Sequence, residues 1–429
     1  MVKPLVQLPH KIYLNGADCF HLMLERNITK HTIGNNIIRM VMTINDHETL
    51  QRIVHNIEIS PIVHWIANSD LKQPFFLNPY WKYKNQGKKI PIIELEGEFD
   101  AIPAQILADN FSLKNGQLIR FHLYKTKDKK IKFVFSFHHI LLDGRGSGLL
   151  IKHLTSDFDP ENFSFQHVFP KPIKKINFIR HTINMFQVKK FVEHTMRKPI
   201  GHPAHEKLKD HEFLLQTKNF TPEETRIIDS NAKKNGARFG TNLFQIACCA
   251  HAVRPFTKDN SDLWLPVPYD GRKRGSNGPI ISNNISFLFY RLSFQSNPTL
   301  EDTVNEISSQ MNEQLKLEMP RKYNEMLQFM KFIPKRFYHW MTTKAGKGAI
   351  SSFLYSSSGE AVWDTSNFST EISDTLLIPP FTYPPGISIT FLRYEGKLRM
   401  NIAVSSNKID NNKLSLLENN LVELLLLGK

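Results

Sequence analysis

The sequence predicts an α/β protein built from two halves, on three observations. The chain has 429 residues, enough for two domains or for one large domain made of two similar halves. Strand-like and helix-like spacings of apolar residues alternate along it. The alternation is interrupted once, by a stretch rich in Lys and Pro at about 160–212, and then restarts. We therefore expect a first half at 1–165, a basic connector at 166–212 and a second half at 213–429.

The first half opens with a strand and a helix. Residues 36–45 (NIIRMVMTIN) are rich in β-branched and apolar residues and predict a strand. Residues 46–57 (DHETLQRIVHNI) place apolar side chains at helical spacing, and Pro61 should end that helix. A strand followed by a helix is thus the local unit.

A β-hairpin and a second helix follow. An extended segment is expected at 90–97, and residues 116–139 contain two apolar runs on either side of the turn sequence KTKDKK. The second run ends at two histidines. The pattern is helical again from Leu149, so the intervening aspartate and glycines lie on a strand-to-helix turn.

The connector is strongly basic. Between Lys171 and Asp210 there are ten Lys or Arg residues against three acidic ones, interleaved with apolar residues. This spacing predicts one or two helices with an apolar face and a solvated basic face. The simpler alternative is a solvated linker with no further role.

The second half repeats the alternation of helices and strands. Thr221 and Glu224 form a capping-box pattern at the start of a helix. Residues 299 to about 345 predict a long helical stretch whose end is aromatic and basic. The other expected elements are a helix at 237–256, strands at 263–270 and 281–294, a hairpin at 386–405 turning at Glu395 and Gly396, and a closing helix at 411–427.

The composition argues against several classes of protein. The three cysteines have no CxxC spacing, so neither a disulfide framework nor a metal site is expected. The first residues lack the apolar run of a signal peptide, and the most apolar runs are far shorter than the roughly 20 residues that span a bilayer. We expect a cytoplasmic protein, with peripheral contact at the inner face of the membrane as an open alternative.

The chain carries a net charge of +15. This charge favours anionic partners, among them phosphorylated cofactors, acidic carrier proteins, anionic lipid surfaces and nucleic acids. No nucleic-acid-binding motif accompanies the charge, so no nucleic acid partner is expected.

The segment FSFHHILLDGRGSG (135–148) carries the strongest chemical signal. A histidine at the end of a strand is rigidly held, and its ordinary pKa near 6.5 suits a general base. Asp143 can curl back to anchor the turn or pair with an arginine, while glycines keep the approach to the histidine open. The plainer interpretation makes Asp143 a helix N-cap, one histidine a hydrogen-bonded strand-end residue and the other a residue that faces solvent. The four fixed residues of HHxxxDG should occur by composition in about one such chain in a thousand, which favours the chemical interpretation.

These residues, HHILLDG at 138–144, resemble the HHxxxDG active-site motif of an acyltransferase superfamily. The superfamily includes peptide-synthetase condensation domains, bacterial wax ester synthase/diacylglycerol acyltransferases and chloramphenicol acetyltransferase. The flanking hairpin from Ser112 is similar to the same region of these proteins. Weaker similarities lie at 14–26, where Asp18 matches the family's acid, and at 235–251, 265–275 and 278–292.

The chain departs from the family pattern at three points. Asn242 is followed by Leu243 where the family usually has aspartate. No DFGWG sequence occurs, which argues against the plant branch. The segment KHTIGNNIIRM replaces the PMHVGG-type segment of wax ester synthases, so that subfamily stays open.

The resemblance implies a fold of two chloramphenicol acetyltransferase-like subdomains, each a mixed β-sheet packed with helices, with a tunnel between them. It implies that His139 is the catalytic base, which takes a proton from a hydroxyl or amine acceptor as the acceptor attacks an acyl thioester. His138 would orient the turn, Asp143 would hold it and Gly144 would keep the tunnel clear. Arg272 is the arginine expected to pair with Asp143.

Two further features of the sequence concern the oxyanion and the acyl chain. Candidate donors for a tetrahedral oxyanion are Asn284, Ser286 and Ser388, although an ordinary polar strand residue is the favoured interpretation of each. Residues 321–348 combine aromatic and apolar residues with seven Lys or Arg. They could line an acyl-chain channel, lie on a membrane surface or form a core helix with a basic edge.

We therefore expect a thioester-dependent acyltransferase, for which transfer to a hydroxyl, forming an ester, is favoured over transfer to an amine. It would hold no permanent cofactor and use acyl-CoA or a phosphopantetheine thioester as co-substrate, with a hydrophobic alcohol, phenol or amine as acceptor. One alternative is a free-standing condensation-type protein that takes acyl groups from an acidic acyl carrier protein docked on the basic surface. The other is a non-catalytic basic protein that binds nucleic acid or a membrane.

Overall fold

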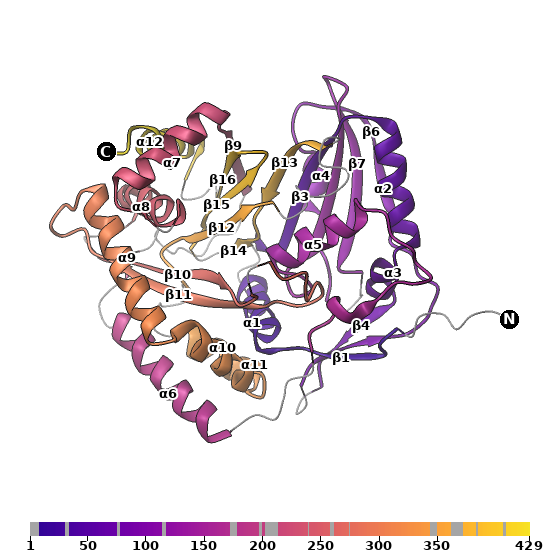
Figure 1. Cartoon of the computed structure of the whole chain (residues 1–429), viewed down its shortest axis with the longest axis horizontal. Coiled ribbons are helices and arrows are strands. Elements are labelled where there is room, and N and C mark those ends of the chain that lie inside the picture. Colours follow the sequence, from indigo (N-terminus) through magenta and orange to yellow (C-terminus); the bar gives the residue numbers. More distant parts are fainter. Residues whose placement is uncertain are drawn as a thin grey trace.

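The chain folds into two lobes that meet around helix α1 (Gly16–Lys30), which lies near the centre of the view in Figure 1. This α/β architecture of sheets and helices in two lobes confirms the predicted fold class. The structure is a computed structural model. It describes residues 8–30, 34–74, 78–113, 117–171, 178–196, 200–201, 213–238, 240–257, 261–273, 275–343, 350–361, 372–382, 385–405 and 409–429.

The first lobe is built on a five-stranded sheet in the order β13-β3-β8-β7-β6. Neighbouring strands are antiparallel except β6 and β7. The predicted strand at 36–45 and the predicted hairpin are both confirmed. The strands are β3 (Ile37–Ile44), β6 (Ile92–Phe99), β7 (Ile119–Thr126), β8 (Ile131–His138) and β13 (Ile372–Ile378).

Alternation along β8 places its aromatic residues in the core. Phe133, Phe135 and Phe137 share one face of the strand, are at most 1% exposed, and stack in a row with Phe121 of β7. The core that contains them is closed by the helices α2 (His47–Ile59), α3 (Pro61–Ala67) and α5 (Gly144–Leu154). As predicted, the first of these helices ends before Pro61. That proline then starts a new helix, capped by Ser60.

Strand β13 corrects the simple division into halves. It lies within 213–429, yet it pairs with β3 in the sheet of the first lobe. A short pairing of β14 (Phe381–Thr382) with β2 (Gly34–Asn35) also joins the two parts of the chain. Because β3 would otherwise expose an unpaired edge, this crossing protects the sheet and ties the lobes together. The boundary at 213 therefore divides the chain but not its sheets.

The second lobe contains a four-stranded sheet in the order β12-β15-β16-β9. The predicted hairpin is confirmed, with Glu395 and Gly396 both at positive φ in its turn. The predicted capping box of Thr221 and Glu224 is also present. The elements are β9 (Phe213–Asn219), β12 (Leu354–Glu360), β15 (Ile387–Tyr394) and β16 (Lys397–Ser405), with helices α7 (Pro222–Lys234), α8 (Asn242–Val253) and α12 (Asn411–Leu427).

A separate antiparallel hairpin, β10 (Leu263–Asp270) and β11 (Ile285–Leu292), carries the remaining helices. The long helical stretch predicted from 299 to about 345 is helical, but it is divided into separate helices. The chain bends at Glu318, whose φ is 52°, and prolines begin or precede the next two helices. Three helices result: α9 (Leu300–Lys316), α10 (Met319–Met330) and α11 (Lys335–Thr343).

The connector contains helix α6 (Phe178–Thr195), which packs on α10 and β11. Its buried Val188 joins a cluster with Trp264 and Phe289, while its lysines face outward. The predicted amphipathic helix is therefore present, and it belongs to the packing of the second lobe. Parts of the connector at 172–177, 197–199 and 202–212 lie outside the described residues.

The remaining elements border the first lobe. They are β1 (Lys11–Tyr13), β4 (Ser69–Lys72) and β5 (Tyr80–Tyr83), which form a three-stranded sheet, and α4 (Ala104–Ala108). Among the described residues, no helix is both long and apolar enough to cross a lipid bilayer.

The start of α5 packs tightly against the other part of the chain. A Cβ atom on Gly146 would lie 2.5 Å from the carbonyl oxygen of Ile280, closer than such atoms approach. A Cβ atom on Gly144, two residues earlier, would meet only Ser358 Oγ at 3.8 Å. The glycine required by the packing is therefore Gly146.

We predict that Gly146→Ala lowers the free energy of unfolding by about 1–3 kcal/mol, because backbone must move to admit the methyl group. Gly144→Ala is the matched control and should cause no comparable loss. Urea unfolding of both variants measures the difference. Equal stability of the two variants would contradict this account.

Candidate active site

The two histidines lie at the end of β8, and their ring nitrogens have opposite hydrogen-bonding roles. Nδ1 of His138 accepts the backbone N–H of Ile140 at 3.2 Å, so its Nε2 carries the proton. This Nε2 lies 3.2 Å from the carboxylate of Glu25 on α1. His138 is 1% exposed and both its nitrogens are used. It therefore supports the turn and presents no open nitrogen.

His139 is partly exposed and is held differently. Its Nδ1 lies 3.1 Å from the carbonyl oxygen of Leu142, to which it donates, so Nε2 is the unprotonated nitrogen. Its backbone N–H donates to Asn36 and its carbonyl accepts from the side chain of Asn283. Burial lowers the pKa of His139 below its ordinary 6.5, which keeps the ring neutral at pH 7.

Asp143 is held by four hydrogen bonds and does not need His139 as a partner. Its carboxylate accepts the N–H of Gly146 at 2.7 Å, as a helix cap, and the N–H of Asn284 at 2.8 Å. Arg272 donates to both carboxylate oxygens, at 2.8 and 3.0 Å. The side chains of Asp143 and Arg272 are only 3% and 1% exposed. The N-cap interpretation and the arginine-pair interpretation therefore both hold.

The other expected residues divide into two groups. Asn284 lies against Asp143 through its backbone, and Gly144 faces Ser358 of β12 on the second lobe. Ser286 corrects an expectation, because its buried hydroxyl donates its only proton to the carbonyl of Pro320 at 2.6 Å. Ser388 is buried in β15 between β12 and β16, and no described contact joins it to the motif.

Helix α1 supplies contacts to the motif that the sequence analysis did not single out. Asp18, noted only as matching the family's acid, accepts the backbone and side-chain N–H groups of Asn283 at 2.7 and 3.1 Å. Burial raises the pKa of Asp18 to about 7, against the effect of these hydrogen bonds. His21 stacks on His139, and Glu25 contacts His138. The spacing of 18, 21 and 25 places all three on one helix face, which is the signal that could have found them.

Comparison with known proteins agrees with this geometry. A family model described as Condensation domain matches residues 83–160, which contain β6, the β7–β8 hairpin and the motif. Linear gramicidin synthase subunits D and B from Brevibacillus parabrevis are each 21% identical, over 269 and 286 residues. These alignments cover 55% and 60% of this chain, and the chain spans only 5% of the length of each relative.

Solved structures share the fold over nearly the whole chain. A trichothecene 15-O-acetyltransferase from Fusarium sporotrichioides has a TM-score of 0.69 at 12% identity, covering 100% of this chain and 99% of that one. The first condensation domain of the CDA synthetase has a TM-score of 0.67 at 15% identity, covering 97% and 96%. The chain has the fold of the condensation-domain superfamily.

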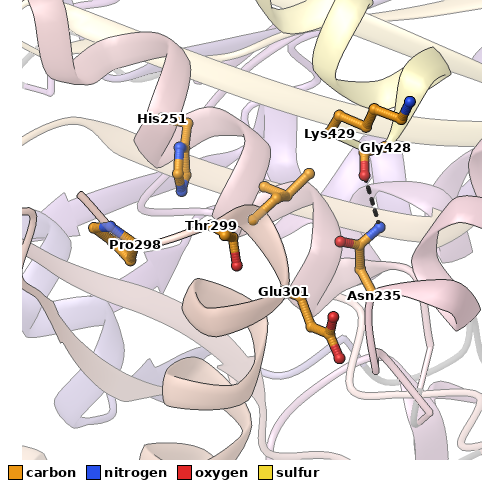
Figure 2. A pocket seen from close by; sticks show the side chains of 8 residues that line it. Asn235, His251, Pro298, Thr299, Glu301, Gly428 and Lys429 are labelled. Atoms are coloured by element: carbon orange, nitrogen blue, oxygen red, sulfur yellow. Dashed lines mark hydrogen bonds between the residues drawn. The ribbon is translucent and has the colours of Figure 1, made fainter. Parts of the chain in front are cut away.

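A cavity of about 440 Å³ in this condensation-domain fold lies away from the motif. Figure 2 shows it at the start of α9, beside α8 and the C-terminal residues. His251 of its lining is already hydrogen-bonded to Thr303 at 2.8 Å, and no residue of HHILLDG lines it. The cavity is lined by Asn235, His251, Pro298, Thr299, Leu300, Glu301, Gly428 and Lys429.

We predict that Asp143→Ala lowers the free energy of unfolding by about 3 kcal/mol, because the buried Arg272 guanidinium loses its buried carboxylate partner and keeps only the half-exposed Asp270, at 3.1 Å, and the carbonyl of Pro279. The double variant Asp143→Leu/Arg272→Met removes both charges and should lose less than the single variant. Urea unfolding measures both.

The matched control is Asp229→Ala. Asp229 forms a similar two-oxygen pair with Arg393, but this pair is partly exposed, with side chains 32% and 22% exposed. A loss of about 1 kcal/mol or less is expected there. Equal losses for Asp143→Ala and Asp229→Ala would contradict the proposed importance of burial.

Proposed function

We propose that this protein is an acyltransferase that moves an acyl group from a thioester to a hydroxyl or amine acceptor, with His139 as general base. One observation carries the proposal. The Nδ1 hydrogen bond to Leu142 and the lowered pKa leave Nε2 of a partly exposed histidine unprotonated. A neutral, firmly oriented imidazole is what general-base catalysis requires near neutral pH.

The reaction can be written with this one base. The acceptor O–H or N–H gives its proton to Nε2 of His139 as its oxygen or nitrogen bonds to the thioester carbonyl carbon. The tetrahedral intermediate then collapses, the C–S bond breaks, and the departing sulfur takes the proton from the imidazolium. The products are an ester or amide and a free thiol, so no acyl-enzyme is needed.

The other residues of the motif would hold the base in place. Asp143 and Arg272 fasten the turn to the segments around β10 and β11, and His138 fastens it to α1. Gly144 keeps the space facing Ser358 free of a side chain. Among the residues expected as oxyanion donors, Asn284 is the one attached to the motif, while the Ser286 proton is committed to Pro320.

The thioester donor would be acyl-CoA or the phosphopantetheine arm of a carrier protein. An alcohol or phenol acceptor agrees with the fold shared with a 15-O-acetyltransferase. The second candidate is condensation with carrier-bound acyl groups. It is favoured by the matched condensation-domain model and by the net charge of +15, which would attract an acidic carrier.

We predict that His139→Ala lowers the transfer rate about 100- to 10,000-fold, the usual contribution of a general base. Thiol release is followed with an acyl-CoA pool and with an acyl carrier protein, and mass spectrometry identifies the products with alcohol, phenol and amine acceptors. His251→Ala, which alters a histidine far along the chain in the second lobe, is the control. Unchanged thiol release by a folded His139→Ala protein would rule out His139 as the base.

We also predict the direction of the pH dependence. Since burial holds the pKa of His139 below 6.5, protonation of Nε2 removes the base only as the pH falls through that lowered value. The rate should therefore be level between about pH 7 and 8 and decline in more acidic solution. A kcat profile of the wild-type protein tests this. A controlling ionisation above pH 7 would contradict the assignment.

A further inference from the structure

His21 of α1 lies face to face with the proposed base. The centroids of the His21 and His139 rings are 3.9 Å apart, and the ring planes are inclined by 26°. The two rings come from different elements, one from the N-terminal helix and one from the turn after β8. His21 is only 4% exposed, so its ring is enclosed between them.

Both ring nitrogens of His21 are buried without a hydrogen-bond partner in the part of the chain that the structure describes. A buried polar group without a partner costs stability, and a leucine or phenylalanine would avoid that loss. Residues that break a local rule in this way are typical of functional sites. In this structure, the ring with the unpartnered nitrogens is the one that stacks on His139.

His21 remains neutral while His139 exchanges protons. Burial lowers the pKa of His21 well below its ordinary value, and the neighbouring His139 and His138 lower it further. The titratable groups that face His139 are His21 from α1, His138 from β8 and Asp143 from the turn. Charge formed on His139 is therefore placed against an uncharged aromatic face.

We propose that His21 is a positioning residue for the base, which holds the ring plane of His139 by stacking and presents a π face to the imidazolium that His139 becomes. The inference rests on the proposed function. A cation within about 6 Å of an aromatic centroid is attracted to the ring face, and the observed separation is well inside that limit. The hydrogen bond from Nδ1 to the Leu142 carbonyl alone would still allow the His139 ring to rotate about that bond, and stacking on His21 restricts this rotation.

Three substitutions separate the ring of His21 from its nitrogens. His21→Phe keeps a ring without nitrogens, His21→Asn keeps a polar nitrogen without a ring, and His21→Leu keeps neither. We expect His21→Leu and His21→Asn to lower kcat about 10- to 100-fold with KM little changed, because the orientation of the base is lost. His21→Phe should retain at least about tenfold more kcat than His21→Leu. Thiol release from an acyl-CoA pool is the assay.

Thermal stability and the titration of His139 distinguish a positioning role of His21 from a purely structural one. His21→Leu should unfold at a temperature no lower than the wild-type protein, since it removes an unpartnered polar group. Titration of the His139 imidazole by NMR should give a pKa about one unit lower in His21→Leu than in His21→Phe. His251→Leu is the matched control for loss of a histidine and should leave both the rate and the His139 titration unchanged.

Two results would overturn the proposal. If His21→Leu keeps wild-type kcat and His139 titration, the stack has no role. If His21→Asn retains the wild-type rate and His21→Phe does not, the nitrogens of His21 act on the reaction and stacking of its ring does not. Should His139→Ala itself leave thiol release unchanged, the proposed function fails, while the NMR comparison still decides whether the stack acts on His139.

Discussion

The carboxylate of Asp143 is the interaction on which the placement of the site depends. It accepts N–H groups from the start of α5, from Arg272 and from Asn284. Arg272 lies 129 residues further along the chain, and Asn284 lies 141 residues further. Both members of the ion pair are almost fully buried, so neither finds water if the contact opens. Because one carboxylate satisfies donors from both lobes, the histidine turn cannot move relative to the second lobe without leaving a buried charge unpaired.

Helix α1 is the second support of the turn, and it explains why neighbouring histidines differ. Glu25 accepts from Nε2 of His138, and the Ile140 N–H occupies the other nitrogen. In His139 the bond to Leu142 uses Nδ1 instead, so the opposite nitrogen stays open. Two identical side chains thus have opposite tautomers. The backbone that surrounds them sets the chemistry that each can perform.

Local features were predictable from the sequence, and contacts between distant segments were not. The β7–β8 hairpin and the Thr221 capping box follow from neighbours a few residues apart. The crossing of β13 depends on which edge of which sheet is free, and the direction of the Ser286 hydroxyl depends on where Pro320 lies. Sequence alone contains neither fact.

Two further signals are present in the sequence. Pro320 and Pro334 lie within the stretch predicted to be helical, and since proline removes a donor that a helix interior needs, they indicate where that stretch is divided. Asp18, His21 and Glu25 share a helix face, and the sequence does not show that this face of α1 lies beside the motif. The pairing of Asp143 with Arg272 could be expected only through a family resemblance, since the spacing of the two residues carries no such information.

The surroundings of His139 depart from the apolar core that fills the rest of the first lobe. The ring nitrogens of His21 and the side-chain oxygen of Asn283 are buried without partners among the described residues, and burial raises the pKa of Asp18 to about 7. Each departure costs stability. His21 and Asn283 contact the histidine turn directly, and Asp18 is joined to it through Asn283. In such a water-poor polar cluster, hydrogen bonds and charges act more strongly than they do in solvent. The same burial that destabilises the cluster keeps His139 neutral, so the loss of stability and the capacity to accept a proton have one physical origin.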